Sequence, residues 1–219
     1  LVGMLLTLLS LTSAQAATIT VGSSGDHTTI GAAIAASADG DRVEVSAGTY
    51  DEAVDFLGKS ITVIGSAGPL ATIITGDGEQ TVRMDSGEGG GTRLEGFTIQ
   101  GAGHTCIWIE DASPRLDNLI VKECGDIGDS DGGGAMVESG SPQFSSVQFV
   151  SNVGESGGGL WVGDEADLTL ENCSFTSNSG GTGGGIACVR ASLTLRNVDF
   201  STNEALESNG GAISAIECT

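Results

Sequence analysis

Short apolar runs alternate with Gly, Ser and Asn clusters along this chain, and from residue 132 onward the alternation becomes periodic. Tetrads that open with two or three glycines begin at residues 132, 157, 183 and 210, which gives periods of 25, 26 and 27 residues. A Phe-x-x-Asn motif lies between successive tetrads, at 149–152, 175–178 and 200–203. A fixed period of this length indicates a structural repeat.

Each period contains two short β-rich runs, such as Leu160–Val162 and Leu168–Phe175, separated by turn-forming residues. No run has the apolar spacing of a long helix. Strands this short bury their apolar side chains when coils stack at about 4.8 Å with like positions aligned. We therefore predict an all-β, right-handed parallel β-helix solenoid of about seven coils, with handedness taken from the general preference for right-handed parallel crossovers.

The repeated motifs have structural roles in such a solenoid. We expect the phenylalanines of the three Phe-x-x-Asn motifs to stack as an aromatic column inside the coils. The three asparagines should form a ladder of hydrogen bonds from coil to coil, because a buried unpaired amide is costly. We expect the glycine runs to supply positive φ angles at a tight corner.

The chain opens with an apolar run over residues 1–16 that ends in Ala14-Gln15-Ala16. This run has the length and the small-x-small ending of a secretory signal peptide, so residues 1–16 are predicted to be removed and the β-helix domain to span 17–219. The run has neither an initiating Met nor a basic start, and the chain stops just after a repeat begins. We expect the sequence to be truncated at both ends.

Apolar residues at 30, 33 and 34, a candidate cap at Thr28 or Thr29 and a stop at Gly40 predict one short helix over Ile30–Ala38. We expect this helix to cap the N-terminal end of the solenoid, where an uncovered coil would expose core and strand edges. Between residues 61 and 109 the strands persist but their spacing varies, which indicates loops inserted between strands.

Two family resemblances follow from these motifs. The helix followed by strands at 43–45 and 61–64 resembles the opening of pectin-lyase-like β-helices. The pairing of the tetrads with Phe-x-x-Asn resembles the repeats of chlamydial polymorphic outer-membrane proteins over about the last 90 residues, although three tetrads carry a third glycine. The second resemblance implies an autotransporter passenger that acts as a surface adhesin.

The formal net charge is −21, with only eight Lys and Arg residues. Nucleic-acid binding is therefore disfavoured, because phosphate contacts need clustered basic residues. An acidic surface should also oppose acidic pectin unless Ca²⁺ bridges the two. No membrane span is predicted within the segment.

Five cysteines, Cys106, Cys124, Cys173, Cys188 and Cys218, occur without a C-x-x-C pair, which argues against zinc and thioredoxin-like chemistry. Cys173 and Cys188 align with inward valines of neighbouring repeats. We favour buried thiols that pack as small hydrophobes, with one or two disulfides as the alternative in an exported chain.

The densest acidic loop contains Asp126, Asp129 and Asp131 among glycines. These carboxylates form a weak candidate Ca²⁺ site, since Ca²⁺ takes six to eight oxygen ligands. The spacing matches neither an EF-hand nor the glycine-rich calcium nonapeptide, and a solvated loop is the favoured interpretation. No other cofactor is expected.

Enzymes that act on polysaccharides share this fold, but their signatures are missing. Trp108-Ile-Glu-Asp111 departs from the Trp-Ile-Asp-His of pectate lyases, and His27 and His104 stand alone. No catalytic residue is therefore assigned. We favour a non-catalytic secreted or cell-surface adhesion module that binds glycans or proteins, with a polysaccharide lyase or glycoside hydrolase as the alternative.

Overall fold

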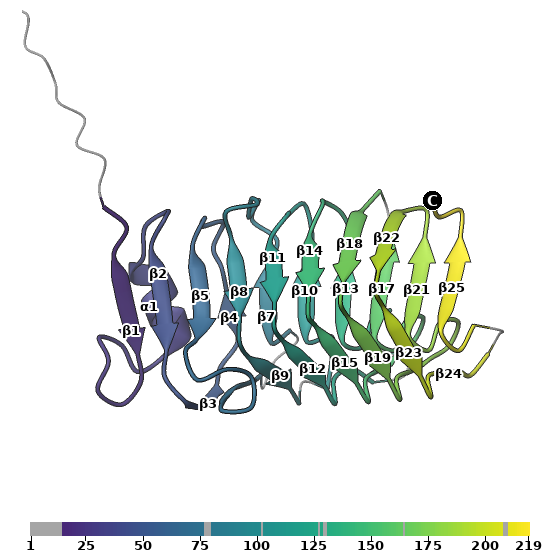
Figure 1. Ribbon diagram of the computed structural model, residues 1–219, viewed down its shortest axis with the longest axis horizontal. Helices are drawn as coiled ribbons and strands as arrows, with labels where there is room; N and C mark the ends of the chain where they lie inside the picture. The colour runs from purple at the N-terminus through teal and green to yellow at the C-terminus, as the bar shows by residue number, and fades with distance from the viewer. Residues whose placement is uncertain are drawn as a thin grey trace, which may run out of the picture.

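The computed structural model describes residues 15–76, 80–101, 103–126, 128, 131–163, 165–207 and 210–219. The chain winds into a parallel β-solenoid whose coils follow one another along a single axis, from β1 at the N-terminal end to β25 at the C-terminal end (Figure 1). Every strand pair recorded in the described part of the chain is parallel, as predicted.

Three long sheets form the walls of the solenoid. Sheet A contains β1 (Thr18–Val21), β2 (Arg42–Val45), β5 (Thr62–Gly65), β8 (Arg93–Glu95), β11 (Arg115–Asp117), β14 (Gln143–Ser145), β18 (Asp167–Glu171) and β22 (Ser192–Arg196). Sheet B contains β3 (Gly48–Asp51), β6 (Thr72–Thr75), β9 (Thr98–Gln100), β12 (Ile120–Lys122), β15 (Gln148–Val150), β19 (Ser174–Thr176) and β23 (Asp199–Ser201).

Sheet C contains β4 (Val54–Asp55), β7 (Val82–Met84), β10 (Ile107–Ile109), β13 (Ala135–Val137), β17 (Leu160–Gly163), β21 (Ile186–Val189) and β25 (Ile213–Ile216). A short fourth sheet joins β16 (Val153–Gly154), β20 (Ser179–Gly180) and β24 (Glu204–Ala205). Sheet A has eight strands among the described residues, one more than the predicted seven coils. The additional strand is β1, which precedes the helix and pairs with β2.

The longer β-rich run of each repeat is divided by a bend. The stretch Leu168–Phe175 is not one run: β18 ends at Glu171, Asn172 takes a φ of 54°, and β19 begins at Ser174. Equivalent bends lie at Asn118 (φ 50°), Ser146 (φ 56°) and Asn197 (φ 52°). Asn adopts this left-handed conformation more readily than most residues, so these positions turn the chain from sheet A into sheet B.

The glycine runs have a different role from the one predicted. None of the residues 132–134, 157–159 and 183–185 has positive φ. Instead, a Cβ added at Gly133 or Gly158 would overlap backbone atoms of the adjacent coil, beginning with the carbonyl oxygens of Val153 and Ser179. The prediction was therefore wrong about the reason for these glycines, which allow close approach of backbones rather than an unusual dihedral angle.

The aromatic column and the asparagine ladder are confirmed. The rings of Phe149 and Phe175 stack with centroids 4.6 Å apart, and those of Phe175 and Phe200 stack at 5.1 Å. Asn152 Nδ2 donates to Asn178 Oδ1 at 2.9 Å, and Asn178 Nδ2 donates to Asn203 Oδ1 at 3.0 Å. Each of these amides also donates to a carbonyl of the preceding coil, which satisfies both amide protons.

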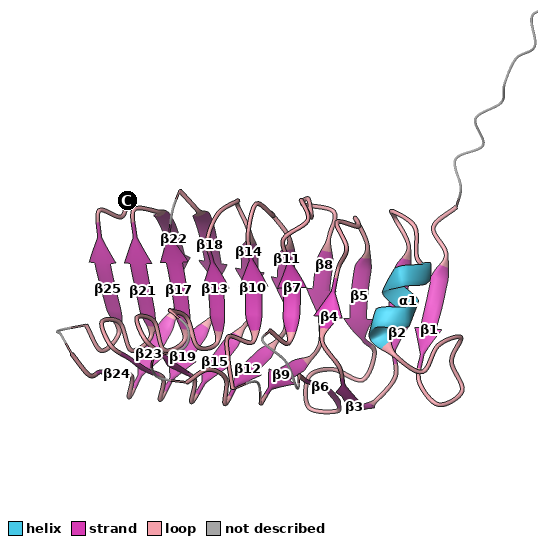
Figure 2. Cartoon of the chain, turned by 180° about the vertical axis from the view of Figure 1, so that it is seen from behind, coloured by secondary structure: helices cyan, strands magenta, loops and turns pink. Residues whose placement is uncertain are grey.

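The predicted N-terminal helix is α1 (Ile30–Ala36), which begins at the Thr29 cap and ends two residues earlier than expected. It ends early because Ser37 is extended and its backbone N–H and hydroxyl both return to carbonyls of the last turn. Figure 2 shows α1 beside β1 and β2 at the N-terminal end, where sheets B and C have not yet begun. Its buried face, Ile30, Ala33 and Ile34, joins the core and covers this end, as predicted.

Two disulfides are present, so the favoured prediction of unpaired thiols was wrong for four of the five cysteines. Cys106 bonds to Cys124 within one coil, and Cys188 bonds to Cys218 across 30 residues of sequence. Cys173 is the free, buried cysteine and packs in the core as predicted. Burial raises the pKa of the Cys173 thiol, which keeps it protonated and unreactive.

Candidate functional site on sheet A

The outward side chains of sheet A form two parallel rows. Leu94, Leu116, Phe144 and Leu170 point into the core and occupy equivalent positions on neighbouring strands. The residues immediately before and after these anchors therefore point outward, because side chains alternate along a strand. One row contains Arg93, Arg115, Gln143, Thr169 and Thr194, and the second contains Glu95, Asp117, Ser145, Glu171 and Arg196.

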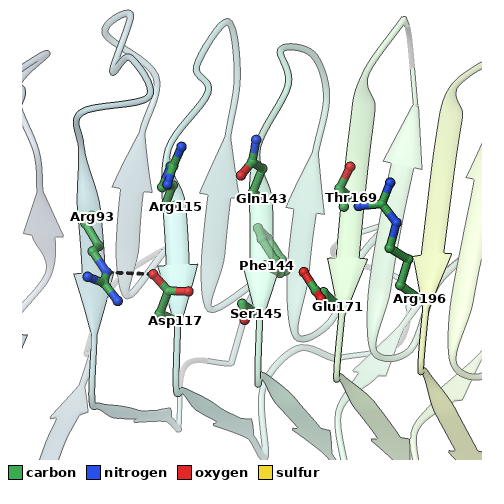
Figure 3. Close-up of a pocket in the computed structure, with 9 residues that line it drawn as sticks. All are labelled: Arg93, Arg115, Asp117, Gln143, Phe144, Ser145, Thr169, Glu171 and Arg196. Atoms are coloured by element: carbon green, nitrogen blue, oxygen red, sulfur yellow. Dashed lines mark hydrogen bonds and ion pairs between the residues drawn. The ribbon is translucent and has the colours of Figure 1, made fainter.

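These rows line a shallow pocket of about 400 Å³. Its walls are Arg93, Arg115, Asp117, Gln143, Phe144, Ser145, Thr169, Glu171 and Arg196. Figure 3 shows the pocket side chains on neighbouring strands of sheet A, with Arg196 reaching from the second row toward Thr169 in the first. We call this surface the sheet A pocket.

Arg93 is held within the pocket by two carboxylates. Its Nε lies 2.6 Å from Asp117 Oδ2, and its terminal nitrogen lies 3.1 Å from Glu95 Oε2 (Figure 3 draws the first contact). Both ion pairs lie on the partly exposed surface, where an ion pair contributes at most about 1 kcal/mol to the free energy of unfolding. The pair therefore fixes the orientation of Asp117 more than it stabilises the fold.

Arg115 and Arg196 differ from Arg93. Both are exposed, and neither makes a salt bridge among the residues that the structure describes. Once Arg93 and Asp117 are paired, these two arginines face only one further carboxylate of the pocket, that of Glu171. The pocket lining holds three arginines and two carboxylates, and Glu95 beside it pairs with Arg93, so this surface is close to neutral on a chain of net charge −21. Repulsion of an acidic ligand is therefore weaker here than the net charge of the chain suggests.

The geometry suits a long polar ligand. Arg115 on β11 and Arg196 on β22 are three strands apart, which corresponds to about 14 Å along the solenoid axis. Guanidinium groups bind carboxylates in two-pronged hydrogen bonds, and Gln143, Ser145 and Thr169 lie between them with groups that donate and accept. A ligand that touches both arginines must be longer than one sugar ring.

Sequence reasoning did not identify these residues, although a signal was present. Leu116, Phe144 and Leu170 recur once per coil at equivalent positions of sheet A, and their immediate neighbours in the sequence are the pocket residues. Four of the eight basic residues of the chain, Arg42, Arg93, Arg115 and Arg196, lie on this one face. The sequence does not reveal this clustering, because equivalent positions on successive coils lie about 20 to 30 residues apart along the chain.

The residues predicted to bind Ca²⁺ are only partly described. Asp129 lies outside the described residues, and the Asp131 carboxylate accepts a hydrogen bond from Ser156 Oγ at 2.8 Å. No group of three His, Cys, Asp or Glu side chains suited to a metal occurs among the described residues. The Asp126, Asp129 and Asp131 site stays a prediction.

The residues weighed for catalysis in the sequence are dispersed. Trp108 lies on β10 of sheet C, and Asp111 forms a left-handed bend (φ 49°) after that strand. His27 is half-buried beside β1, whereas His104 precedes β10, several coils away. The structure does not bring these groups together.

A sequence-family profile described as "Right handed beta helix region" matches residues 80–217, which is more than half of the chain. The chain belongs to this right-handed β-helix family. The match agrees with the predicted handedness and with the parallel coils. No curated protein sequence matches the chain, and the predicted likeness to chlamydial repeats stays a prediction.

Solved structures with a similar fold include several pectin methylesterases. The enzyme from carrot is 19% identical with a TM-score of 0.56, and the alignment covers 81% of this chain and 63% of the enzyme. PemA from Erwinia chrysanthemi is 13% identical with a TM-score of 0.56, covering 84% and 67%. A pectin methylesterase in complex with a hexasaccharide is 12% identical with a TM-score of 0.55, covering 84% and 67%.

At these identities the likeness establishes the fold and no more. The chain spans less than two thirds of the carrot enzyme's length. The pectin-lyase-like resemblance is thereby confirmed at the level of the fold. In the part of the chain that the structure describes, no helix is long and apolar enough to cross a membrane.

Proposed function

We propose that this protein is a carbohydrate-active β-helix that binds an acidic polysaccharide in the sheet A pocket. The observation that carries the proposal is the pair of exposed arginines, Arg115 and Arg196, set about 14 Å apart along a groove of hydrogen-bonding side chains. A polyuronate presents carboxylates and hydroxyls at regular intervals, which this row of side chains matches in chemistry.

Two carboxylates of the pocket are suited to chemistry on the bound chain. Asp117 is fixed by Arg93, and Glu171 lies two strands away in the same row, beside the strand position of Arg196. Carboxylates placed along a bound glycan serve as general acid, general base or nucleophile in hydrolysis of esters and glycosides. The solved pectin methylesterases add support for action on a polysaccharide over the adhesion function favoured from sequence.

Binding is tested with polygalacturonate oligomers by titration calorimetry. The double substitution Arg115→Ala and Arg196→Ala should weaken binding about tenfold or more, since each guanidinium–carboxylate hydrogen-bond pair is charge-assisted. Arg83→Ala is the matched control, because Arg83 lies on sheet C and is paired with Asp85. Unchanged affinity in the double variant would refute the site.

Turnover is tested separately on the same polymer. Methanol release from methylated pectin identifies an esterase, new reducing ends identify a hydrolase, and unsaturated products identify a lyase. Glu171→Gln should abolish any such activity while retaining the bound oligomer. Binding without turnover would instead support the adhesion module, and export after residue 16, with a secreted or outer-membrane location, stays part of either proposal.

A further inference from the structure

A second pocket lies on another face of the solenoid, over sheet C. It has a volume of about 250 Å³ and is lined by Gln80, His104, Thr105, Trp108, Gly128, Asp131, Met136 and Glu155. None of these residues lines the sheet A pocket. We call this cavity the sheet C pocket.

One wall of the sheet C pocket is an indole ring. Trp108, Met136, Trp161 and Ala187 occupy equivalent positions on neighbouring strands and form a small apolar cluster outside the core. Met136 and Trp161 are 7% and 9% exposed, whereas Trp108 is only half-buried. The cluster therefore supports Trp108 from one side and leaves part of its ring facing the pocket.

The other walls are anchored by covalent and hydrogen bonds. The Cys106–Cys124 disulfide follows Thr105 directly, and Gly125 N donates to the His104 carbonyl at 2.9 Å. Thr105 Oγ1 donates to the carbonyl of Gly132 on the next coil. On the far side, Asp131 is fixed through Ser156. These bonds fix the two loops that carry Thr105 and Asp131.

The sheet C pocket differs in charge from the sheet A pocket, which holds three arginines. Its lining contains two carboxylates, Asp131 and Glu155, and no Lys or Arg. The face of an indole attracts cations and C–H groups, and nearby carboxylates add their own Coulomb attraction for a cation. An acidic sugar would be repelled here, whereas a positively charged one is attracted to both the ring and the carboxylates.

We propose that the sheet C pocket binds a sugar residue that carries a protonated amine, as in a 2-amino-2-deoxyhexose. The sugar ring stacks on Trp108, the ammonium group faces Asp131 and Glu155, and Gln80 and His104 meet the hydroxyls. This assignment does not depend on the function proposed for sheet A. The two pockets together give one chain separate sites for anionic and cationic glycans.

The test uses glucosamine hexamer and N-acetylglucosamine hexamer, which differ in charge but share the same sugar ring. Trp161→Phe leaves Trp108 as the only tryptophan, so fluorescence titration of that variant reports on the pocket. The glucosamine hexamer should change the emission and bind about tenfold more tightly than the acetylated hexamer. Equal affinity for both hexamers, or no response to either, would overturn the proposal.

Substitutions in the sheet C pocket test whether its residues bind the hexamer. Trp108→Ala and Glu155→Gln, measured by calorimetry, should each weaken glucosamine hexamer binding several-fold, while Trp108→Phe keeps an aromatic face and most of the affinity. Arg115→Ala should leave this binding intact, and Trp108→Ala should leave polygalacturonate binding intact. Loss of both activities in either variant, or tighter binding of a lysine hexapeptide than of the hexamer, would count against an amino-sugar site.

Discussion

The two halves of this solenoid are stabilised in different ways. In the C-terminal half, identical side chains repeat one coil apart, so Phe149, Phe175 and Phe200 stack and Asn152, Asn178 and Asn203 hydrogen-bond in series. In the N-terminal half, the stabilising contacts join unlike residues and are not repeated from coil to coil. Glu52 accepts from the backbone N–H groups of Ile30 and Gly31 at 2.7 and 2.9 Å.

Lys59 makes a corresponding contact at the other end of the same helix. Its Nζ donates to the carbonyls of Ile34, Ala35 and Ser37 at 2.6, 2.8 and 2.8 Å. Buried Glu88 likewise accepts from Gly58 N and Ser86 N. In a repeated sequence, one set of stabilising contacts recurs from coil to coil. In an irregular sequence, each loop is stabilised by its own, different contacts.

The largest effect should come from the aromatic column. Phe175→Ala removes a fully buried ring that is stacked on both sides, and should lower the free energy of unfolding by about 3–5 kcal/mol. Phe97 in the N-terminal half is equally buried but has no stacked ring partner among the described residues. Chemical denaturation of Phe175→Ala and Phe97→Ala compares the two halves directly.

A double-mutant cycle isolates the stacking itself. Phe149→Ala and Phe175→Ala should show a coupling of about 0.5–1.5 kcal/mol. Additive effects would mean that the column contributes through burial alone, and the contrast between the halves would then lose its aromatic component.

The next effect should come from the asparagine ladder. Asn178→Ala leaves the Asn152 amide and the Phe149 carbonyl without their partners, and should cost about 1–3 kcal/mol. The control is Asn197→Gly on the outer surface, which keeps the left-handed bend and loses an exposed hydrogen bond to Asn172. The control should change stability by at most about 0.5 kcal/mol. An unchanged denaturation midpoint for Asn178→Ala would refute the ladder's contribution.

In the N-terminal half, Lys59→Met should act locally. It removes three charge-assisted hydrogen bonds from the C-terminal end of α1, and we expect a loss of about 1–2 kcal/mol confined to that helix. Hydrogen exchange should accelerate in residues 30–37 and stay unchanged in the Phe-x-x-Asn coils. Lys122→Met is the matched control, since among the described residues the one ion pair of Lys122 is with exposed Glu123 at 3.6 Å. Faster exchange throughout the chain would show that the halves are not independent.

The smallest effect should be a loss of local stability at acidic pH. Hydrogen bonds from the backbone N–H groups of Ala38 and Ala17, in that order, lower the pKa of Asp41. A lowered pKa means that the unfolded state binds the proton more readily, so the contribution is present above the unfolded pKa and is lost as pH falls through the folded value. Exchange of the β1 and β2 amides should therefore rise below about pH 4, and Asp41→Asn should remove this dependence. An identical acid response in the variant would contradict the assignment.

The sequence by itself determined the repeat, and with it the solenoid, the inward phenylalanines and the asparagine ladder. It could do so because stacked coils place equivalent residues in contact, so sequence period and spatial neighbourhood coincide. The short helix could also be predicted, because the Thr29 cap and the spacing of Ile30, Ala33 and Ile34 are local sequence signals.

Tertiary structure alone decided the features that no local pattern or repeat in the sequence specifies. The partners of Cys106 and Cys188, the close backbone approach at Gly133 and Gly158, and the eighth strand of sheet A depend on how far each loop carries the chain. The sheet A pocket is of the same kind: Arg115 and Arg196 are 81 positions apart in the sequence and meet a common groove only after three coils have stacked. Sequence records which side chains face outward, but the winding of the coils decides which of them share a surface.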